Sequence, residues 1–211
     1  MEPPRGTDPL IPRLLLVTDR RATRDRVLID VVSQALDAGL PAVQLREKDL
    51  PGRPLLALAE ELRRATAERG ALLFVNERLD VARAIGADGV HLGAESFPVE
   101  AARTLVPRAL VGASVHAVAE AAASRADFVV FGPVFATPSK ARFGAPHGTG
   151  PLAEAVRGAT VPVLAIGGID AARLDAVRGT GAHGVAVIRA ILAAADPAAA
   201  TRALLDGLGA W

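Results

Sequence analysis

The chain contains no cysteine, and only 3% of its 211 residues are aromatic. The lack of cysteine excludes disulfides and thiolate chemistry, and it is compatible with the cytoplasmic location that we expect. Few aromatic residues, a net charge of +1 and the lack of a basic run argue against a nucleic-acid binder. No apolar run approaches the length of a membrane span, so we expect no membrane partner.

Other absences narrow the chemistry. The sequence has no Gly-x-Ser-x-Gly elbow and no pair of histidines with the spacing of a zinc site. Residues 1–12 lack the apolar core of a signal peptide. We expect residues 1–12 to form a flexible lead-in and residues 13–211 to form one domain.

Short apolar runs alternate with alanine-rich helical stretches along that domain. The predicted strands are 14–18, 42–46, 72–76, 89–92, 110–115, 128–134, 161–166 and 184–188. The predicted helices are 26–38, 54–69, 78–85, 99–105, 117–125, 151–157, 171–178 and 197–208. Strands separated by helices form parallel sheets, and eight such units in about 200 residues predict an α/β fold, a single (β/α)8 TIM barrel.

An internal echo supports this fold. The segment Gly86–Val90 resembles Gly181–Val185, and Arg125–Val129 is a weaker third copy. Each copy lies where a helix ends and the next strand begins, and glycine there suits the left-handed residue of a helix C-terminus. The competing fold, an open doubly wound sheet, favours a glycine-rich loop after the first strand. The turn at 18–21 has no glycine.

The segment Val43–Lys48 carries the strongest functional signal. Gln44, Arg46 and Lys48 alternate with apolar residues, so the three polar side chains leave one face of the strand. A buried strand carries such residues together when an anion compensates them, as at a barrel mouth that holds a phosphate-bearing ligand. The alternative is an exposed edge strand with a solvated face.

Other polar residues follow the predicted strands, at the end where such barrels place their chemistry. They are Asn76, Glu77, His91, Glu95, Ser114, His116, Thr137, Ser139, Lys140 and Arg189. Gly167 and Gly168 open the seventh helix and would cradle a phosphate with backbone N–H groups, although a plain tight turn explains them equally well. The loop 135–150, which includes Gly148, is either a lid or a surface loop. His91 is either a hydrogen-bonded core residue or a site residue, and His116 is a site candidate.

The chain resembles thiamine phosphate synthase and the related TenI-like thiazole tautomerase over roughly residues 14–191. The motifs that carry the resemblance occur in order along the chain. They are Leu16–Asp19, Gln44–Lys48, Gly86–Gly93, Ser114-x-His116, Gly132–Lys140 and Ala165–Ile169.

The resemblance implies a transferase that couples hydroxymethylpyrimidine diphosphate with thiazole phosphate and releases diphosphate. It implies that the pyrimidine and its diphosphate are bound by Gln44, Arg46, Lys48, Asn76, His91 and Lys140. It implies that the thiazole phosphate is bound near Thr137, Ser139, Gly167 and Gly168, with Arg189 in place of the usual serine. Such substrates are small phosphate and diphosphate esters, and family members often pair as homodimers.

The resemblance also implies Mg²⁺, normally bound by two aspartates. This chain has Glu77 after Asn76 and Ser96 at the second position, with Glu95 beside it. Glu77 and Glu95 are therefore the candidate metal ligands.

Three hypotheses remain. An active synthase is favoured by the complete set of cationic and amide residues. A tautomerase that aromatises a thiazole carboxylate phosphate would use His116 as its acid–base residue and no metal. A non-catalytic barrel that binds thiamine precursors or a protein shares the fold.

Overall fold

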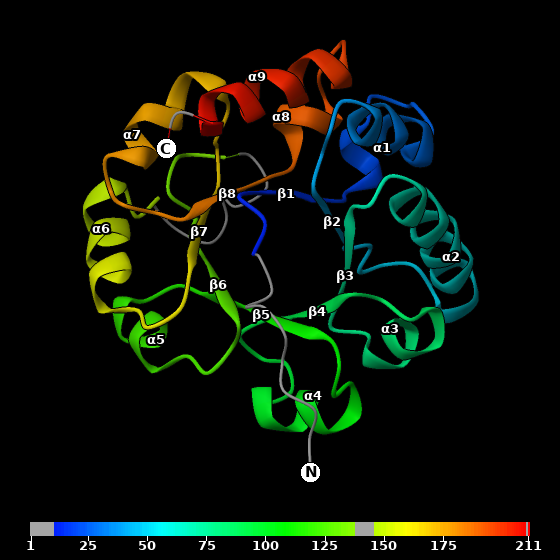
Figure 1. Cartoon of the computed structure of the whole chain (residues 1–211), viewed down its shortest axis with the longest axis horizontal. Coiled ribbons are helices and arrows are strands. Elements are labelled where there is room, and N and C mark those ends of the chain that lie inside the picture. The colour runs from blue at the N-terminus through cyan, green and yellow to red at the C-terminus, as the bar shows by residue number, and fades with distance from the viewer. Residues whose placement is uncertain (1–10, 138–145, 210) are drawn as a thin grey trace.

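Eight parallel strands form the centre of the molecule, which we describe from a computed structural model covering residues 11–137, 146–209 and 211. Each strand pairs with the next, and the first pairs with the last, so the sheet closes into a barrel (Figure 1). The strands are β1 (Leu14–Val17), β2 (Ala42–Leu45), β3 (Leu72–Asn76), β4 (Gly89–Leu92), β5 (Leu110–Val115), β6 (Phe128–Phe131), β7 (Val163–Ile166) and β8 (Gly184–Val187). The predicted TIM barrel is confirmed, and the open doubly wound sheet is excluded.

Helices surround the barrel (Figure 1). They are α1 (Leu28–Asp37), α2 (Gly52–Glu68), α3 (Leu79–Ile85), α4 (Val99–Leu105), α5 (Val118–Ala123), α6 (Thr149–Gly158), α7 (Leu174–Arg178), α8 (Arg189–Leu192) and α9 (Pro197–Gly209), with short 3₁₀ helices η1 (Arg20–Ala22) and η3 (Ala171–Arg173). Each longer helix buries one stripe. In α2, Leu55, Ala59 and Leu62 recur at helical spacing and are buried against the strands.

Most predicted strand boundaries agree with the structure to within two residues, and two predictions at the C-terminal ends of strands need correction. The sixth strand was expected to continue to Val134, but β6 ends at Phe131 because Pro133 has no N–H to donate to a neighbouring strand. Arg189 was expected at the end of the eighth strand, but β8 ends at Val187 and Arg189 begins α8. A four-residue helix is too short to give a periodic signal.

The strands bury two separate apolar layers because successive side chains alternate faces. Val43 and Leu45 of β2 belong to the larger core, between the strands and the helices. Ala42 belongs to a smaller core inside the barrel, together with Phe74 and Phe128, whose rings meet edge to face at 5.4 Å. Side chains therefore fill the interior of the barrel.

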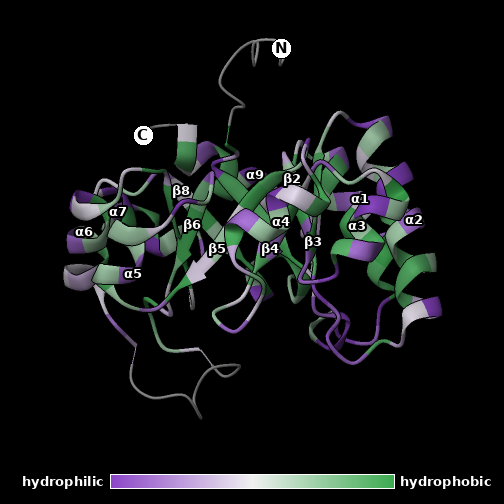
Figure 2. Cartoon of the chain, turned by 90° about the horizontal axis from the view of Figure 1, so that it is seen from below, coloured by the Kyte–Doolittle hydropathy of each residue, from purple (hydrophilic) through white to green (hydrophobic). Residues whose placement is uncertain are grey.

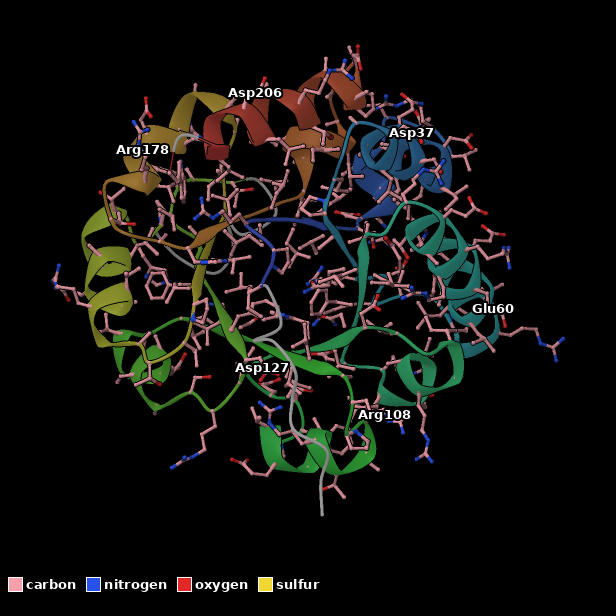
Figure 3. The ribbon with its side chains drawn as sticks, in the orientation of Figure 1. Asp37, Glu60, Arg108, Asp127, Arg178 and Asp206 are labelled. Carbon is pink, nitrogen blue, oxygen red and sulfur yellow. The ribbon has the colours of Figure 1, made fainter. Side chains whose placement is uncertain are left out.

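The sequence echo corresponds to a repeated interaction: an aspartate just before a strand accepts a backbone N–H of the preceding strand and pairs with an arginine of a helix. Asp88, before β4, accepts the N–H of Leu73 at 2.7 Å and pairs with Arg63 of α2. Asp127, before β6, accepts the N–H of Val111 at 2.7 Å and pairs with Arg103 of α4. Figure 3 labels Asp127 between α4 and the strands. The echo thus serves the fold, as expected.

The copy at Gly181–Val185 has His183 in place of aspartate. Its Nε2 donates to the carbonyl oxygen of Ile11 at 2.8 Å. Ile11 and Pro12, which fall within the expected lead-in, are buried here. No helix in the described part of the chain is long and apolar enough to cross a membrane.

Candidate active site

The loops that follow the strands collect at one end of the barrel. Figure 2 shows hydrophilic segments concentrated at the end opposite the C-terminus. Because all strands are parallel, every residue that follows a strand lies at this same end, which we call the mouth. The sequence-predicted residues on separate strands are therefore brought together, as expected.

The end of β2 has one polar side chain inside the barrel and one at the rim. Gln44 is buried, with 3% of its surface exposed, whereas Arg46 is half-buried just beyond the strand. The N–H of Arg46 donates to Oγ1 of fully buried Thr18 at 2.8 Å, and the N–H of Thr18 donates to the carbonyl of Gln44 at 2.9 Å. Residues after β1 and β2 thus hold each other, and an exposed edge strand is ruled out.

His91 of β4 is buried inside the barrel, near Arg46. Its Nε2 is 2.9 Å from Oγ of Ser114 on β5, and its buried Nδ1 has no hydrogen-bond partner in the described structure. Burial, reinforced by the positive charge of Arg46, lowers the pKa of His91 to about 4. His91 is therefore a neutral imidazole at pH 7. Its Nδ1 is the ring nitrogen that could form a further hydrogen bond.

A cavity of about 190 Å³ opens between the ends of β2 and β3. Lys48, Asn76 and Glu77 contribute to its lining. Nζ of Lys48 lies 3.7 Å from Oε2 of Glu77, and both side chains are partly exposed. The predicted cation, amide and carboxylate therefore share one opening.

Glu77 has an unusual backbone, with φ at +59°, a region that non-glycine residues rarely adopt. Its N–H donates to the carbonyl of His91 at 2.9 Å, and the N–H of Arg78 donates to the carbonyl of Asn76 at 2.7 Å, which closes a tight turn at the end of β3. A β-carbon built on Gly93 would lie 2.5 Å from Oε1 of Glu77. The carboxylate is thus held over the end of β4, where glycine leaves room for it.

This arrangement can be compared with the needs of Mg²⁺. The described residues contain no group of three or more histidine, cysteine, aspartate or glutamate side chains that could hold a metal. Mg²⁺ often takes only one or two carboxylates and completes its shell with substrate phosphates and water. Glu77 fits the role of one such carboxylate, and Glu95 lies exposed in the loop after β4.

The loop after β6 is tied to Gly167 and Gly168. The N–H of Val134 donates to the carbonyl of Ile166 at 2.8 Å, and the N–H of Phe135 donates to Gly167 at 3.0 Å. Both glycines have positive φ, and a β-carbon on either would come within 3 Å of this loop. The glycines are therefore required by close packing as well as by the turn.

The far side of the same loop returns to the mouth. The N–H of Gly148 donates to the carbonyl of Val134 at 2.9 Å. Thr137 is half-buried. Ser139 and Lys140, two of the predicted residues, lie outside the described residues. The described flanks place both ends of the loop beside Gly167 and Gly168.

His116 and Arg189 lie nearer the outside. Nδ1 of His116 donates to the carbonyl of Gly132 at 2.6 Å, and its side chain is exposed. Arg189 is exposed at the start of α8. Both stand at the mouth, after β5 and β8 respectively, so the structure brings them to the predicted end of the barrel.

Two features of the mouth escaped the sequence analysis. Arg20 pairs with Glu47 and Asp49, and Arg173 stacks over the ring of Phe135 at 5.1 Å while donating to the carbonyl of Gly168. No local pattern signals either contact, because each joins two separate connections. The alternating charges of residues 46–49 are the one sequence feature that is consistent with ion pairs at this position.

Comparison with known proteins agrees with this geometry. The family model described as "Thiamine monophosphate synthase" matches residues 14–191. The chain is 47% identical to a thiamine-phosphate synthase of Roseiflexus castenholzii over 90% of this chain and 86% of the relative. It is also 47% identical to a thiamine-phosphate synthase of Methanoculleus marisnigri, over 93% and 95% of the two chains.

A solved structure adds support at the level of the fold. The thiamine phosphate pyrophosphorylase of Pyrococcus furiosus is 37% identical, with a TM-score of 0.86, and the match covers 94% of this chain and 96% of that one. The family match spans all eight strands and every described residue of the mouth that the sequence predicted. The chain belongs to the thiamine monophosphate synthase family.

Proposed function

We propose that the mouth couples hydroxymethylpyrimidine diphosphate with thiazole phosphate to give thiamine phosphate and diphosphate. The carrying observation is that Gln44 and His91 are buried inside the barrel, with half-buried Arg46 near enough to lower the pKa of His91. Lys48 and Asn76 line the neighbouring cavity at the ends of β2 and β3. This combination suits a ligand with an anionic tail and a polar heterocycle. The enzyme is a transferase of the pyrimidine-methyl group.

The reaction needs no protein nucleophile. The bond between the pyrimidine methylene carbon and the diphosphate oxygen breaks, and its electron pair leaves with diphosphate. The lone pair of the thiazole nitrogen then forms the new carbon–nitrogen bond. The protein has to stabilise the departing charge and to hold the nitrogen in line with the carbon.

Arg46 and Lys48 would supply the charge stabilisation, together with Lys140 from the loop outside the described residues. Cations aimed at a leaving group act most strongly where water is partly excluded. Arg46 is half-buried, which meets that condition. Lys48 is more exposed and reaches the cavity from its edge.

Gln44, Asn76 and His91 would bind the aminopyrimidine. The amides offer both donors and acceptors to its ring nitrogens and amino group. The low pKa of His91 keeps its ring neutral near pH 7, so it does not repel the positive charge that develops on the pyrimidine. Ser114, bonded to Nε2, sets the orientation of that ring.

Glu77 would provide a carboxylate ligand for Mg²⁺, with Glu95 as a second candidate. The metal, when bound, would neutralise charge on the diphosphate. Glu77 also stands 3.7 Å from Lys48, so it orients that cation in the free protein.

The thiazole phosphate would bind near Thr137, Ser139, Gly148, Gly167 and Gly168, with Arg189 at the start of α8. Both glycines adopt positive φ where β7 gives way to η3, the position at which this fold commonly binds phosphate. The hydrogen bonds between this turn and the loop after β6 would place the thiazole ring between the diphosphate site and the phosphate site.

The test is a coupling assay with both substrates, in Mg²⁺ or in EDTA, followed by detection of thiamine phosphate. Product that requires Mg²⁺ supports the synthase with a bound metal. Product in EDTA supports the synthase without a metal. No product from folded protein in either condition would overturn the proposal and favour the tautomerase.

A further inference from the structure

A buried carboxylate stands in the middle of the cationic segment after β2. Glu47 lies between Arg46 and Lys48 in the sequence, and only 2% of its side chain is exposed. Burying a charge is costly unless the charge is paired and hydrogen-bonded. A carboxylate at an anion-binding rim also opposes the charge that the ligand needs. Glu47 therefore requires an explanation that the coupling chemistry does not give.

Arg20, in the connection after β1, binds this carboxylate through both its backbone and its side chain. Its backbone N–H approaches both carboxylate oxygens of Glu47, at 3.0 and 3.3 Å, and its Nη1 donates to Oε2 at 2.9 Å. The same guanidinium donates to both oxygens of Asp49, each at 2.6 Å. A planar guanidinium that binds two groups in this way fixes their relative position.

The backbone of the segment is held from the same side. The N–H of Arg46 donates to Oγ1 of Thr18 at 2.8 Å. The N–H of Leu50 donates to the carbonyl of Glu47 at 3.1 Å and closes the turn. Arg21 adds a contact to Asp49 at 2.6 Å. The segment 46–49 is thus docked on the β1 connection by both backbone and side chains.

The positive and negative charges of this network balance each other. Two arginines of the β1 connection, Arg20 and Arg21, pair with the two carboxylates of the segment. The network therefore neutralises the segment's own negative charge, so that Glu47 and Asp49 do not compete with a ligand for Arg46 and Lys48; the carboxylate that faces Lys48 is Glu77, at 3.7 Å. The hydrogen bond from Arg20 lowers the pKa of Asp49 to about 2, so Asp49 is ionised near neutral pH.

We propose that Arg20, acting through Glu47 and Asp49, is a positioning residue that orients Arg46 and Lys48 for the diphosphate. The inference rests on the proposed function, because it concerns the same anion site. It assigns a task to Glu47 and Asp49 that direct contact with the substrate does not require. The connection after β1 would therefore contribute to the affinity of the site for diphosphate.

The decisive variant is Glu47→Gln, measured by calorimetric titration of the full chain with inorganic diphosphate. Removal of a negative charge near an anion site should tighten anion binding if only charge matters. Loss of positioning should weaken it instead, by about 10- to 100-fold. The sign of the change therefore separates the two explanations. In the coupling assay, KM for the diphosphate substrate should rise while KM for thiazole phosphate stays unchanged.

Two matched variants serve as controls. Asp25→Asn removes an exposed carboxylate from the same β1 connection, and asparagine tolerates the left-handed backbone found there. It should leave diphosphate affinity unchanged or slightly raised. Asp127→Asn weakens an ion pair at the other end of the barrel. It should lower the melting temperature without changing diphosphate affinity.

Asp49→Asn provides a second test, because Asp49 is partly exposed and its loss leaves no buried charge. A weaker affinity for diphosphate in this variant supports positioning even if Glu47→Gln fails to fold. Unchanged or tighter diphosphate binding by Asp49→Asn, or by folded Glu47→Gln, overturns the inference. Failure of the unmodified protein to bind diphosphate contradicts the proposed function instead.

Discussion

The carboxylate of Glu77 lies over the α-carbon of Gly93, so close that a β-carbon there would stand 2.5 Å from Oε1. The clash is with the free end of a flexible side chain, so Gly93→Ala should displace the carboxylate and leave the fold intact. We expect the Mg²⁺ concentration for half-maximal coupling to rise several-fold, about 3- to 10-fold. A titration of coupling rate against Mg²⁺ tests this, with the melting temperature as control. An unchanged titration curve would remove Glu77 from the metal site.

A second glycine should behave differently. A β-carbon on Gly112 would lie 2.4 Å from the ring of Phe128 and 2.7 Å from Nδ1 of His91, both packed inside the barrel. We expect Gly112→Ala to cost about 1–3 kcal/mol of unfolding free energy by overpacking, measured by urea denaturation. Gly150→Ala, with nothing within 4 Å of the new carbon, is the control and should stay near the parent value.

The strand-start carboxylates should matter more than surface ion pairs. Asp127→Ala leaves the N–H of Val111 without its acceptor, and we expect a loss of about 1–3 kcal/mol. Asp175→Ala removes an exposed pair with Arg178 on the outer helix α7 and should cost less than about 0.5 kcal/mol (Figure 3). Equal losses in thermal unfolding would contradict the assignment.

Stability should fall as the pH drops below about 6.5, because of His91. Its pKa is about 4 in the folded protein, because of burial and then Arg46, and near 6.5 when unfolded. Between these values the unfolded state binds more protons, so acid favours unfolding. The contribution is fully lost near pH 4 and amounts to roughly 3 kcal/mol. Urea denaturation between pH 8 and 4 should show this slope, and His91→Gln should flatten it.

Two variants separate the synthase from the tautomerase. Lys140→Ala should abolish coupling, because a departing diphosphate needs that cation. His116→Ala should leave coupling largely intact, because His116 is exposed and bonded to the carbonyl of Gly132. Turnover measured with both substrates decides. Full activity of the Lys140 variant would remove this residue from the diphosphate site, and loss of coupling in the His116 variant would place that histidine in the synthase reaction.

The parts of the site that could be predicted are those set by alternation along one strand. Gln44 falls on the interior face of β2 because strand side chains alternate and Ala42, two residues earlier, belongs to the inner core; Arg46 follows just beyond the strand and is half-buried. The closed barrel followed from the order of strands and helices. These features depend only on neighbours along the chain.

The parts that could not be predicted depend on contacts between separate connections. Nothing near Arg20 in the sequence indicates that its guanidinium will bind Glu47, 27 residues later. The positive φ of Glu77 likewise has no signal in the sequence: it lies in a tight turn in which the N–H of Arg78 donates to the carbonyl of Asn76 at 2.7 Å. α8 was missed because four residues show no period.

The pairing of β1 with β8 has a consequence for the order in which the protein folds. The bond between His183 and Ile11 joins residues 172 positions apart, near the two ends of the barrel sheet. A chain growing from the ribosome cannot make these contacts until β8 has emerged. Until then β1 exposes an unpaired edge, which other chains can join. Closure should therefore be a late, slow step, during which the nascent chain is most exposed to aggregation.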